Sequence, residues 1–227
     1  MQTHNHSPLY RGLEMALLFI ALPLLLAFNP IIYVSLALVA IALIYIAFIS
    51  RGIWGSGSWK AMFKAAKNAF SLSQNKWGGR PMVLRFAVMF SVFAIGSSAF
   101  VWYNMPDDFF HVVMNNTLLW FFISLFYSVF SVLPQEFLYR VYFIERYGDL
   151  IRHRGALILL NASLFCIAHV MFFNHLVLLL TFCGGLLFSY TYLRTRSFIV
   201  VSVEHSFYGL WLYTVGMGAM LAFPSGT

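Results

Sequence analysis

Residues 117–134 read TLLWFFISLFYSVFSVLP, a run of eighteen residues without a charge. A helix needs about 20 apolar residues to cross the roughly 30 Å hydrocarbon core of a bilayer, so this run predicts a membrane span. Apolar runs of similar length also occur at 12–28, 31–49, 83–103, 156–173, 175–193 and 198–222. We therefore expect an all-α, polytopic transmembrane helix bundle with about seven to eight membrane helices.

The fourth span continues into a more polar segment of the chain. Nothing after Pro134 breaks a helix before about Tyr147, and proline is tolerated near a helix start or at a membrane kink. The predicted helix therefore carries Gln135, Glu136 and Arg140 directly after an apolar span.

Composition supports a membrane protein over a soluble domain. The chain is 61% hydrophobic and 9% charged, and its mean hydropathy is +0.81, values far from those of ordinary globular domains. The net charge of +7 does not indicate nucleic-acid binding, because the basic residues flank apolar spans and form no known binding motif. Both cysteines fall inside predicted spans, so we expect no disulfide.

Lys and Arg residues predict how the chain crosses the membrane. They gather in the connections on one side of the predicted topology, which the positive-inside rule places in the cytoplasm. These residues are Arg51, Lys60, Lys64, Lys67, Lys76, Arg80, Arg85, Arg146, Arg152, Arg154, Arg194 and Arg196. The amino terminus, with Arg11, is expected on the same cytoplasmic side.

The sequence suggests two domains. Residues 1–82 would hold N-terminal membrane helices and a basic cytoplasmic helix at 59–70. The 3.6-residue helical period places the lysines of this helix on one face and its aromatic residues on the other. That helix would lie at the membrane interface, or it would simply tether the two halves. Residues 83–227 would form the functional helix bundle, because most of the intramembrane polar groups fall there.

Three polar motifs interrupt the apolar helices of the second domain. They are Gln135-Glu136-x-x-x-Arg140, Phe165-x-x-x-His169 and His205-x-x-x-Gly209. Ionisable side chains at membrane depth are costly and therefore rare unless they line a cavity or do chemistry. Glu136 and Arg140 lie on one helical face and could pair, either to keep a buried glutamate charged as a base or only to steady the helix end.

Glu136, His169 and His205 lie on separate helices, so only folding can bring them together. A carboxylate to activate water and two imidazoles, one to orient the water and one to stabilise an oxyanion, are what hydrolysis requires. Each histidine alone would more often be a hydrogen bond between helices. Glu136 with both histidines also forms a ligand set for a divalent metal, although no His-Glu-x-x-His helix is present.

Together the motifs resemble the CPBP family of CAAX prenyl endopeptidases and bacteriocin-processing enzymes, also called Abi, over about residues 130–220. The family pattern is Glu-Glu-x-x-x-Arg, Phe-x-x-x-His and His-x-x-x-Asn/Asp on separate membrane helices, and Arg194-Thr195-Arg196-Ser197 is similar to its Arg-Thr-x-Ser turn. The resemblance implies a protease with catalytic residues Glu136, His169, His205, Arg140 and Gln135. It implies a membrane-anchored protein or peptide substrate, with the lipid bilayer as a partner. We expect no nucleic acid and no cofactor, with a divalent metal at Glu136, His169 and His205 as the alternative.

Two positions depart from that pattern. Gln135 stands where the family has the glutamate that activates water, and Gly209 stands where it has Asn or Asp. Either Glu136 performs the task of the missing glutamate, or the chain is a non-catalytic membrane scaffold or chaperone that binds tail peptides. The variants resemble a bacterial, myxosortase-like branch, which favours an active enzyme in a bacterial cytoplasmic membrane.

Overall fold

The computed structural model describes residues 7–29, 41–42, 44–46 and 80–221. These residues form helices and no strand. Within them, the helices long and apolar enough to cross a membrane are Pro8–Phe28, Pro81–Asn104, Thr117–Leu150, Arg154–Phe172, His175–Thr195 and Phe198–Val215. The predicted all-α polytopic fold is confirmed, and the chain is a multi-pass integral membrane protein. The predicted interfacial helix at 59–70 and most of the predicted span at 31–49 lie outside the described residues.

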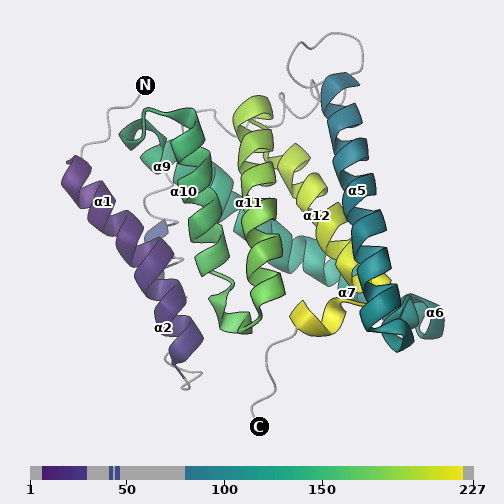
Figure 1. The fold of residues 1–227 in the computed structure, drawn as a ribbon. Helices are drawn as coiled ribbons and strands as arrows, with labels where there is room; N and C mark the ends of the chain where they lie inside the picture. The colour runs from purple at the N-terminus through teal and green to yellow at the C-terminus, as the bar shows by residue number, and fades with distance from the viewer. Residues whose placement is uncertain (1–6, 30–40, 43, 47–79, 222–227) are drawn as a thin grey trace. The chain divides into compact units, whose positions relative to one another are not determined.

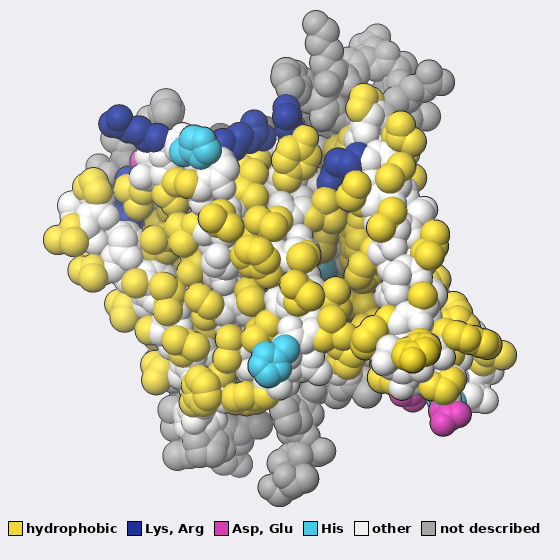
Figure 2. Space-filling view, viewed as in Figure 1, with side chains coloured by type: hydrophobic (Ala, Val, Ile, Leu, Met, Phe, Trp, Pro, Cys, Tyr) yellow, Lys and Arg dark blue, Asp and Glu magenta, His cyan; other side chains and the backbone are white. Residues whose placement is uncertain are grey.

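Large apolar side chains cover the outward surface of these helices, as the face in Figure 2 shows. Leu84, Ile95 and Trp102 of one span and Phe126 and Phe130 of another each expose more than half of their surface. Such exposure is unfavourable in water and favourable against lipid tails. The surface therefore agrees with the spans read from length and hydropathy.

The described residues divide into two compact units that alternate along the chain. The first unit draws on Met1–Ala61 and Leu138–Tyr190, and the second draws on Met62–Phe137 and Thr191–Ala222. This division by contacts differs from the predicted domains 1–82 and 83–227, which stay a prediction.

The first unit begins with α1 (Pro8–Ala16), a π-helical turn (Leu17–Ala21) and α2 (Leu22–Phe28). Its other helices are α9 (Phe143–Tyr147), α10 (Arg154–Ile167) and the part of α11 (His175–Thr195) that ends at residue 190. The Ser7 side chain caps α1 by accepting from the Tyr10 amide at 3.2 Å. Phe19 is fully buried and packs edge-on against Tyr139 and Phe143, with ring centroids 5.2 Å away in each case.

The second unit contains α5 (Arg80–Asn104), α6 (His111–Asn115), α7 (Thr117–Phe126), α8 (Leu133–Glu136) and α12 (Phe198–Val215) (Figure 1). Ser197 caps α12 by accepting from the Val200 amide, and Gly216 ends it with a φ of 113° that favours glycine. Phe90 of α5 packs against Tyr208 and Trp211 of α12 at centroid distances of 5.5 and 5.9 Å. Aromatic contacts thus hold α12 against α5 inside this unit.

The helix Thr117–Leu150 runs past Pro134 as predicted, but it is not regular α-helix throughout. Two π-helical segments, Tyr127–Val132 and Phe137–Tyr142, flank the short α8 that carries Gln135 and Glu136. π-helical turns are rare in proteins, but those that occur are often found at functional sites. The local geometry therefore sets the first motif apart from the surrounding span.

One predicted span end is wrong, and another span is less regular than predicted. The span predicted at 156–173 agrees with the candidate span Arg154–Phe172, but its α-helix ends at Ile167, so His169 lies in the turn between α10 and the 3-10 turn Val170–Phe172. The span predicted at 198–222 ends at Val215, because the left-handed Gly216 terminates the helix. Hydropathy alone missed the end at Val215 because several of the residues after it are still apolar.

Candidate functional site

Glu136 and His205 meet inside the second unit. Glu136 is the last residue of α8 and is fully buried, and His205 is on the second turn of α12 with 7% of its surface exposed. The Oε1 atom of Glu136 lies 2.8 Å from Nδ1 of His205. Residues 69 positions apart in the chain therefore form one buried acid–imidazole pair.

This pair determines which imidazole nitrogen remains available. A carboxylate can only accept, so with Glu136 ionised the proton sits on Nδ1 of His205. In the neutral ring Nε2 is then an acceptor, and the Tyr127 hydroxyl lies 3.2 Å from it. Sequence reasoning missed Tyr127, because nothing in its span distinguishes it from the other aromatic residues.

Gln135 lies beside Glu136 but points to its own helix. Its Nε2 donates to the Ser131 hydroxyl at 2.9 Å, while its Oε1 is buried and has no hydrogen-bond partner among the residues described. An amide has no proton-accepting role at neutral pH, so Gln135 offers a hydrogen-bond acceptor and not a base.

Gly209 lies one helical turn after His205 and is buried. A Cβ atom at this position would overlap the hydroxyl and the ring of Tyr127. The glycine therefore gives Tyr127 the space that a side chain at 209 would fill.

A second charged group in this unit contains Glu204, the neighbour of His205 in sequence. Arg85 of α5 donates from Nη2 to Oε1 of Glu204 at 2.8 Å and to the Thr191 hydroxyl at 2.7 Å. Glu204 is 3% exposed. From the sequence, Arg85 was expected among the loop charges, although its position inside an apolar run indicates a buried partner.

Arg140 belongs to the first unit and is fully buried. Its Nη1 donates to Oδ1 of Asn161 on α10 at 2.8 Å, and its guanidinium lies 4.7 Å from the centroid of the Phe165 ring. Asn161 also donates to the Tyr139 carbonyl at 2.7 Å and accepts from Ser189 of α11 at 2.7 Å. Arg140 thus helps to join three helices, and its predicted pairing with Glu136 stays a prediction.

His169 also belongs to the first unit. Its Nδ1 lies 2.7 Å from the Phe165 carbonyl oxygen, and its ring centroid lies 4.7 Å from that of Phe165. A carbonyl only accepts, so Nδ1 carries the proton and Nε2 of the neutral ring can accept from a water molecule. Phe165 of the second motif therefore contacts both Arg140 and His169, while the convergence of His169 with Glu136 stays a prediction.

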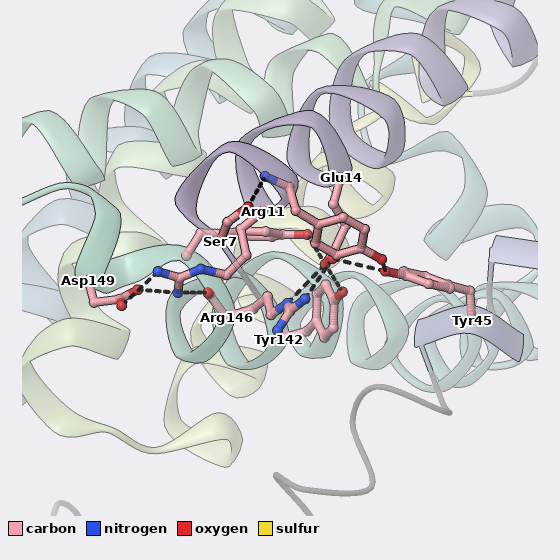
Figure 3. A network of polar contacts seen from close by, with 9 residues as sticks. Ser7, Arg11, Glu14, Tyr45, Tyr142, Arg146 and Asp149 are labelled. Atoms are coloured by element: carbon pink, nitrogen blue, oxygen red, sulfur yellow. Dashed lines mark hydrogen bonds and ion pairs between the residues drawn. The ribbon is translucent and has the colours of Figure 1, made fainter. Parts of the chain in front are cut away.

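Another buried carboxylate, Glu14 of α1, is the centre of a polar network in the first unit (Figure 3). Arg146 donates to it from Nε and Nη2 at 3.0 and 2.7 Å. The hydroxyls of Tyr142, Tyr147 and Tyr45 donate to it at 2.9, 2.6 and 2.9 Å. From the sequence, Arg146 was expected among the loop charges, whereas the structure pairs it with Glu14.

The sequence also predicts Glu136, His169 and His205 as one possible ligand set for a divalent metal. No group of three or more His, Cys, Asp and Glu side chains is placed to hold a metal ion in the part of the chain that the structure describes. Two of the three ligands considered from the sequence, Glu136 and His205, direct Oε1 and Nδ1 at each other.

One comparison with known proteins gives a match. Residues 115–211 match the family model described as type II CAAX prenyl endopeptidase Rce1-like. No curated protein and no solved structure matches the chain. The matched range contains all three motifs, so the resemblance drawn from them is confirmed, while the myxosortase-like branch stays a prediction.

Proposed function

We propose the activity of a glutamic-type intramembrane endopeptidase for this chain, whose residues 115–211 match the type II CAAX prenyl endopeptidase Rce1-like family. At the family level the chain is a protease, a hydrolase that acts on a protein or peptide at a lipid bilayer. The proposed substrate is another protein, cut near its membrane-associated tail in a bacterial cytoplasmic membrane.

The observation that supports this proposal most is the Glu136–His205 pair. A buried carboxylate bonded to an imidazole provides a base beside a group that can carry a proton near neutral pH. Gln135 is next to this base with a buried amide oxygen that can accept a hydrogen bond. The base function that Gln135 lacks is thus available one residue further along the helix.

In the proposed reaction Glu136 takes one proton from a water molecule while the water oxygen bonds to the carbonyl carbon of the substrate. His169 orients this water, and His205 stabilises the negative charge on the carbonyl oxygen in its protonated form, in which Nε2 also carries a hydrogen and can donate. Glu136 then returns the proton to the amide nitrogen as the C–N bond breaks. The products are a new carboxyl end and a free amine, with no oxidant or reductant required.

The test compares membrane-protein tails in cells that lack this chain and in cells that express variants of it. Carboxyl-terminal peptides of the membrane fraction are identified by mass spectrometry. We expect wild type and Glu145→Gln to give shortened tails, and Glu136→Gln and His205→Ala to give the full-length tails of the deletion strain. Glu145→Gln is the matched control because this substitution removes a carboxylate from the same continuous helix, Thr117–Leu150.

Normal shortening by a well-expressed Glu136→Gln protein would show that the assigned base is wrong. If the variants lose effect only in proportion to lost protein, measured by membrane immunoblot and by thermal stability in detergent, the scaffold function is favoured instead. The departures at Gln135 and Gly209 are the reason to retain that second candidate.

We further propose that no cofactor takes part. A metal shared by Glu136 and His205 through Oε1 and Nδ1 would have to replace their 2.8 Å hydrogen bond. Treating purified protein with EDTA or 1,10-phenanthroline is therefore expected to leave cleavage of an identified tail unchanged. Loss of cleavage that Zn²⁺ restores would instead place a metal in the reaction.

A further inference from the structure

We infer that Tyr127 is a positioning residue for His205, and that Gly209 leaves the space that the Tyr127 side chain occupies. The inference about geometry stands on the second unit alone, and only its catalytic consequence rests on the proposed function. The three residues come from the π-helical segment Tyr127–Val132 and from α12.

His205 is held from both sides of its ring. Nδ1 faces Oε1 of Glu136 at 2.8 Å, and Nε2 faces the Tyr127 hydroxyl at 3.2 Å. The Tyr127 ring meets the imidazole edge-on, at a centroid distance of 6.2 Å and an angle of 82°. Two hydrogen bonds at opposite nitrogens fix the ring's rotation and its tautomer, which one bond to Glu136 alone would leave less constrained.

The absence of a side chain at 209 is necessary for this arrangement. Residues 205 and 209 lie one turn apart, so a side chain at 209 would occupy the space next to the imidazole. Any Cβ there would overlap the Tyr127 hydroxyl and ring. Because the overlapping atoms are at the far end of a side chain, Tyr127 would rotate away and its bond to His205 would be lost.

The π-helical segment Tyr127–Val132 helps to place the Tyr127 side chain. Tyr127 is its first residue, and the ring also packs against Tyr213 of α12 at a centroid distance of 5.5 Å. His205, Gly209 and Tyr213 are spaced four residues apart and share a face of α12. Tyr127 therefore lies against the face of α12 on which the middle residue, Gly209, has no side chain.

This arrangement gives Gly209 a role of its own. A polar group from another helix lies beside His205 at the place where a side chain from residue 209 would lie. If the proposed function holds, Tyr127 sets the resting orientation of His205, and a lost hydroxyl should slow turnover without weakening substrate binding.

The test uses a chemical probe and needs no substrate. Diethyl pyrocarbonate acylates neutral imidazole nitrogens, and mass spectrometry of the full-length protein in detergent gives the modification rate of each histidine. Tyr127→Phe keeps the ring and removes the hydroxyl that covers Nε2, so we expect His205 to react at least fivefold faster. Gly209→Ala should also increase the modification rate of His205, because the added methyl group displaces Tyr127.

Tyr213→Phe is the matched control, since it removes a hydroxyl from a ring that packs on Tyr127. The exposed His175 serves as the internal reference for reagent and folding. An unchanged His205 rate in Tyr127→Phe, or an equal increase in Tyr213→Phe, would overturn the inference. Because the assay requires no cleavage, it can succeed or fail independently of the protease proposal.

A second measurement addresses catalysis once a cleaved tail is identified. Tyr127→Phe is expected to lower kcat about tenfold with KM unchanged, whereas Tyr213→Phe leaves both unchanged. In Tyr127→Ala, the added change Gly209→Asn has room for an amide beside His205 and should recover part of kcat. A larger KM with constant kcat, or no recovery in the double variant, contradicts a positioning role.

Discussion

Glu14 in the first unit and Glu136 in the second are both buried carboxylates on helices suited to cross a membrane, yet their partners differ in chemistry. Glu14 accepts from a guanidinium and three phenol hydroxyls, groups that keep their protons near neutral pH. Glu136 faces an imidazole, a group that exchanges protons in that range. Under the proposed function, the comparison contrasts a carboxylate whose imidazole partner can take part in proton transfer with one whose partners only hold it in place.

The partners of Glu14 show what such a clamp connects. Arg146 of α9 binds Glu14 of α1, and Arg11 of α1 binds Asp149 at 2.7 Å and the Arg146 carbonyl at 3.0 Å. Two ion pairs in opposite directions thus join the first helix of the chain to the end of the long helix Thr117–Leu150. We therefore expect the Glu14 network to serve stability and the Glu136–His205 pair to serve catalysis.

His169→Ala should have the largest effect and is the severest test of the comparison, because His169 lies in the same unit as the Glu14 network. Loss of an imidazole that orients water should lower cleavage of an identified tail about 10²-fold or more. The rate per folded molecule, measured by peptide mass spectrometry, gives the result. His175→Ala removes an exposed imidazole and should cleave normally. A normal rate for His169→Ala would confine catalysis to Glu136, His205 and their neighbours.

Arg146→Ala should mainly cost stability. Removing one partner of a buried ion pair leaves the other charge uncompensated, so we expect the free energy of unfolding to fall by about 3 kcal/mol. Unfolding by SDS in mixed micelles measures the change. Arg152→Ala, at an exposed position, should have little effect.

The double variant Glu14→Met, Arg146→Met should recover most of the stability lost in Arg146→Ala, because an apolar pair leaves no buried charge. The rate of cleavage per folded molecule should equal that of the wild type in all of these variants. A fall in that rate with stability unchanged would mean that the Glu14 network takes part in the reaction.

Sequence predicted the elements of this molecule better than their connections. The spans and the continuation of the helix past Pro134 follow from apolar length and from the lack of a breaker, which are local properties. Arg85 and Arg146 were counted as loop charges, because a charge near a span end looks the same whether it meets water or a buried carboxylate. Gly209 was read as a missing polar residue, since only the fold brings Tyr127 into its space.

Asn161→Ala should lower the free energy of unfolding by about 2 kcal/mol. Asn161 links Arg140, the Tyr139 carbonyl and Ser189, and the variant leaves a buried guanidinium without this acceptor. Ser163→Ala is a matched control on the same helix, because among the described residues its hydroxyl bonds to the carbonyl of Leu159, one turn earlier. A loss of cleavage per folded molecule in Asn161→Ala alone would give Arg140 a part in catalysis beyond its place in the helix contacts.

Gly185→Ala should have the smallest effect, a loss of about 1 kcal/mol. Its Cβ would lie 2.8 Å from the Cα of Ala162, a backbone atom that can move only with α10. Gly96→Ala adds a methyl group with no atom within 4 Å and should not destabilise the protein. Ala162 follows Asn161, so separating α10 from α11 should also weaken the Ser189–Asn161 bond. The losses in Gly185→Ala and Asn161→Ala should then sum to more than the loss in the double variant, whereas strict additivity would mean that close packing and the polar link act independently.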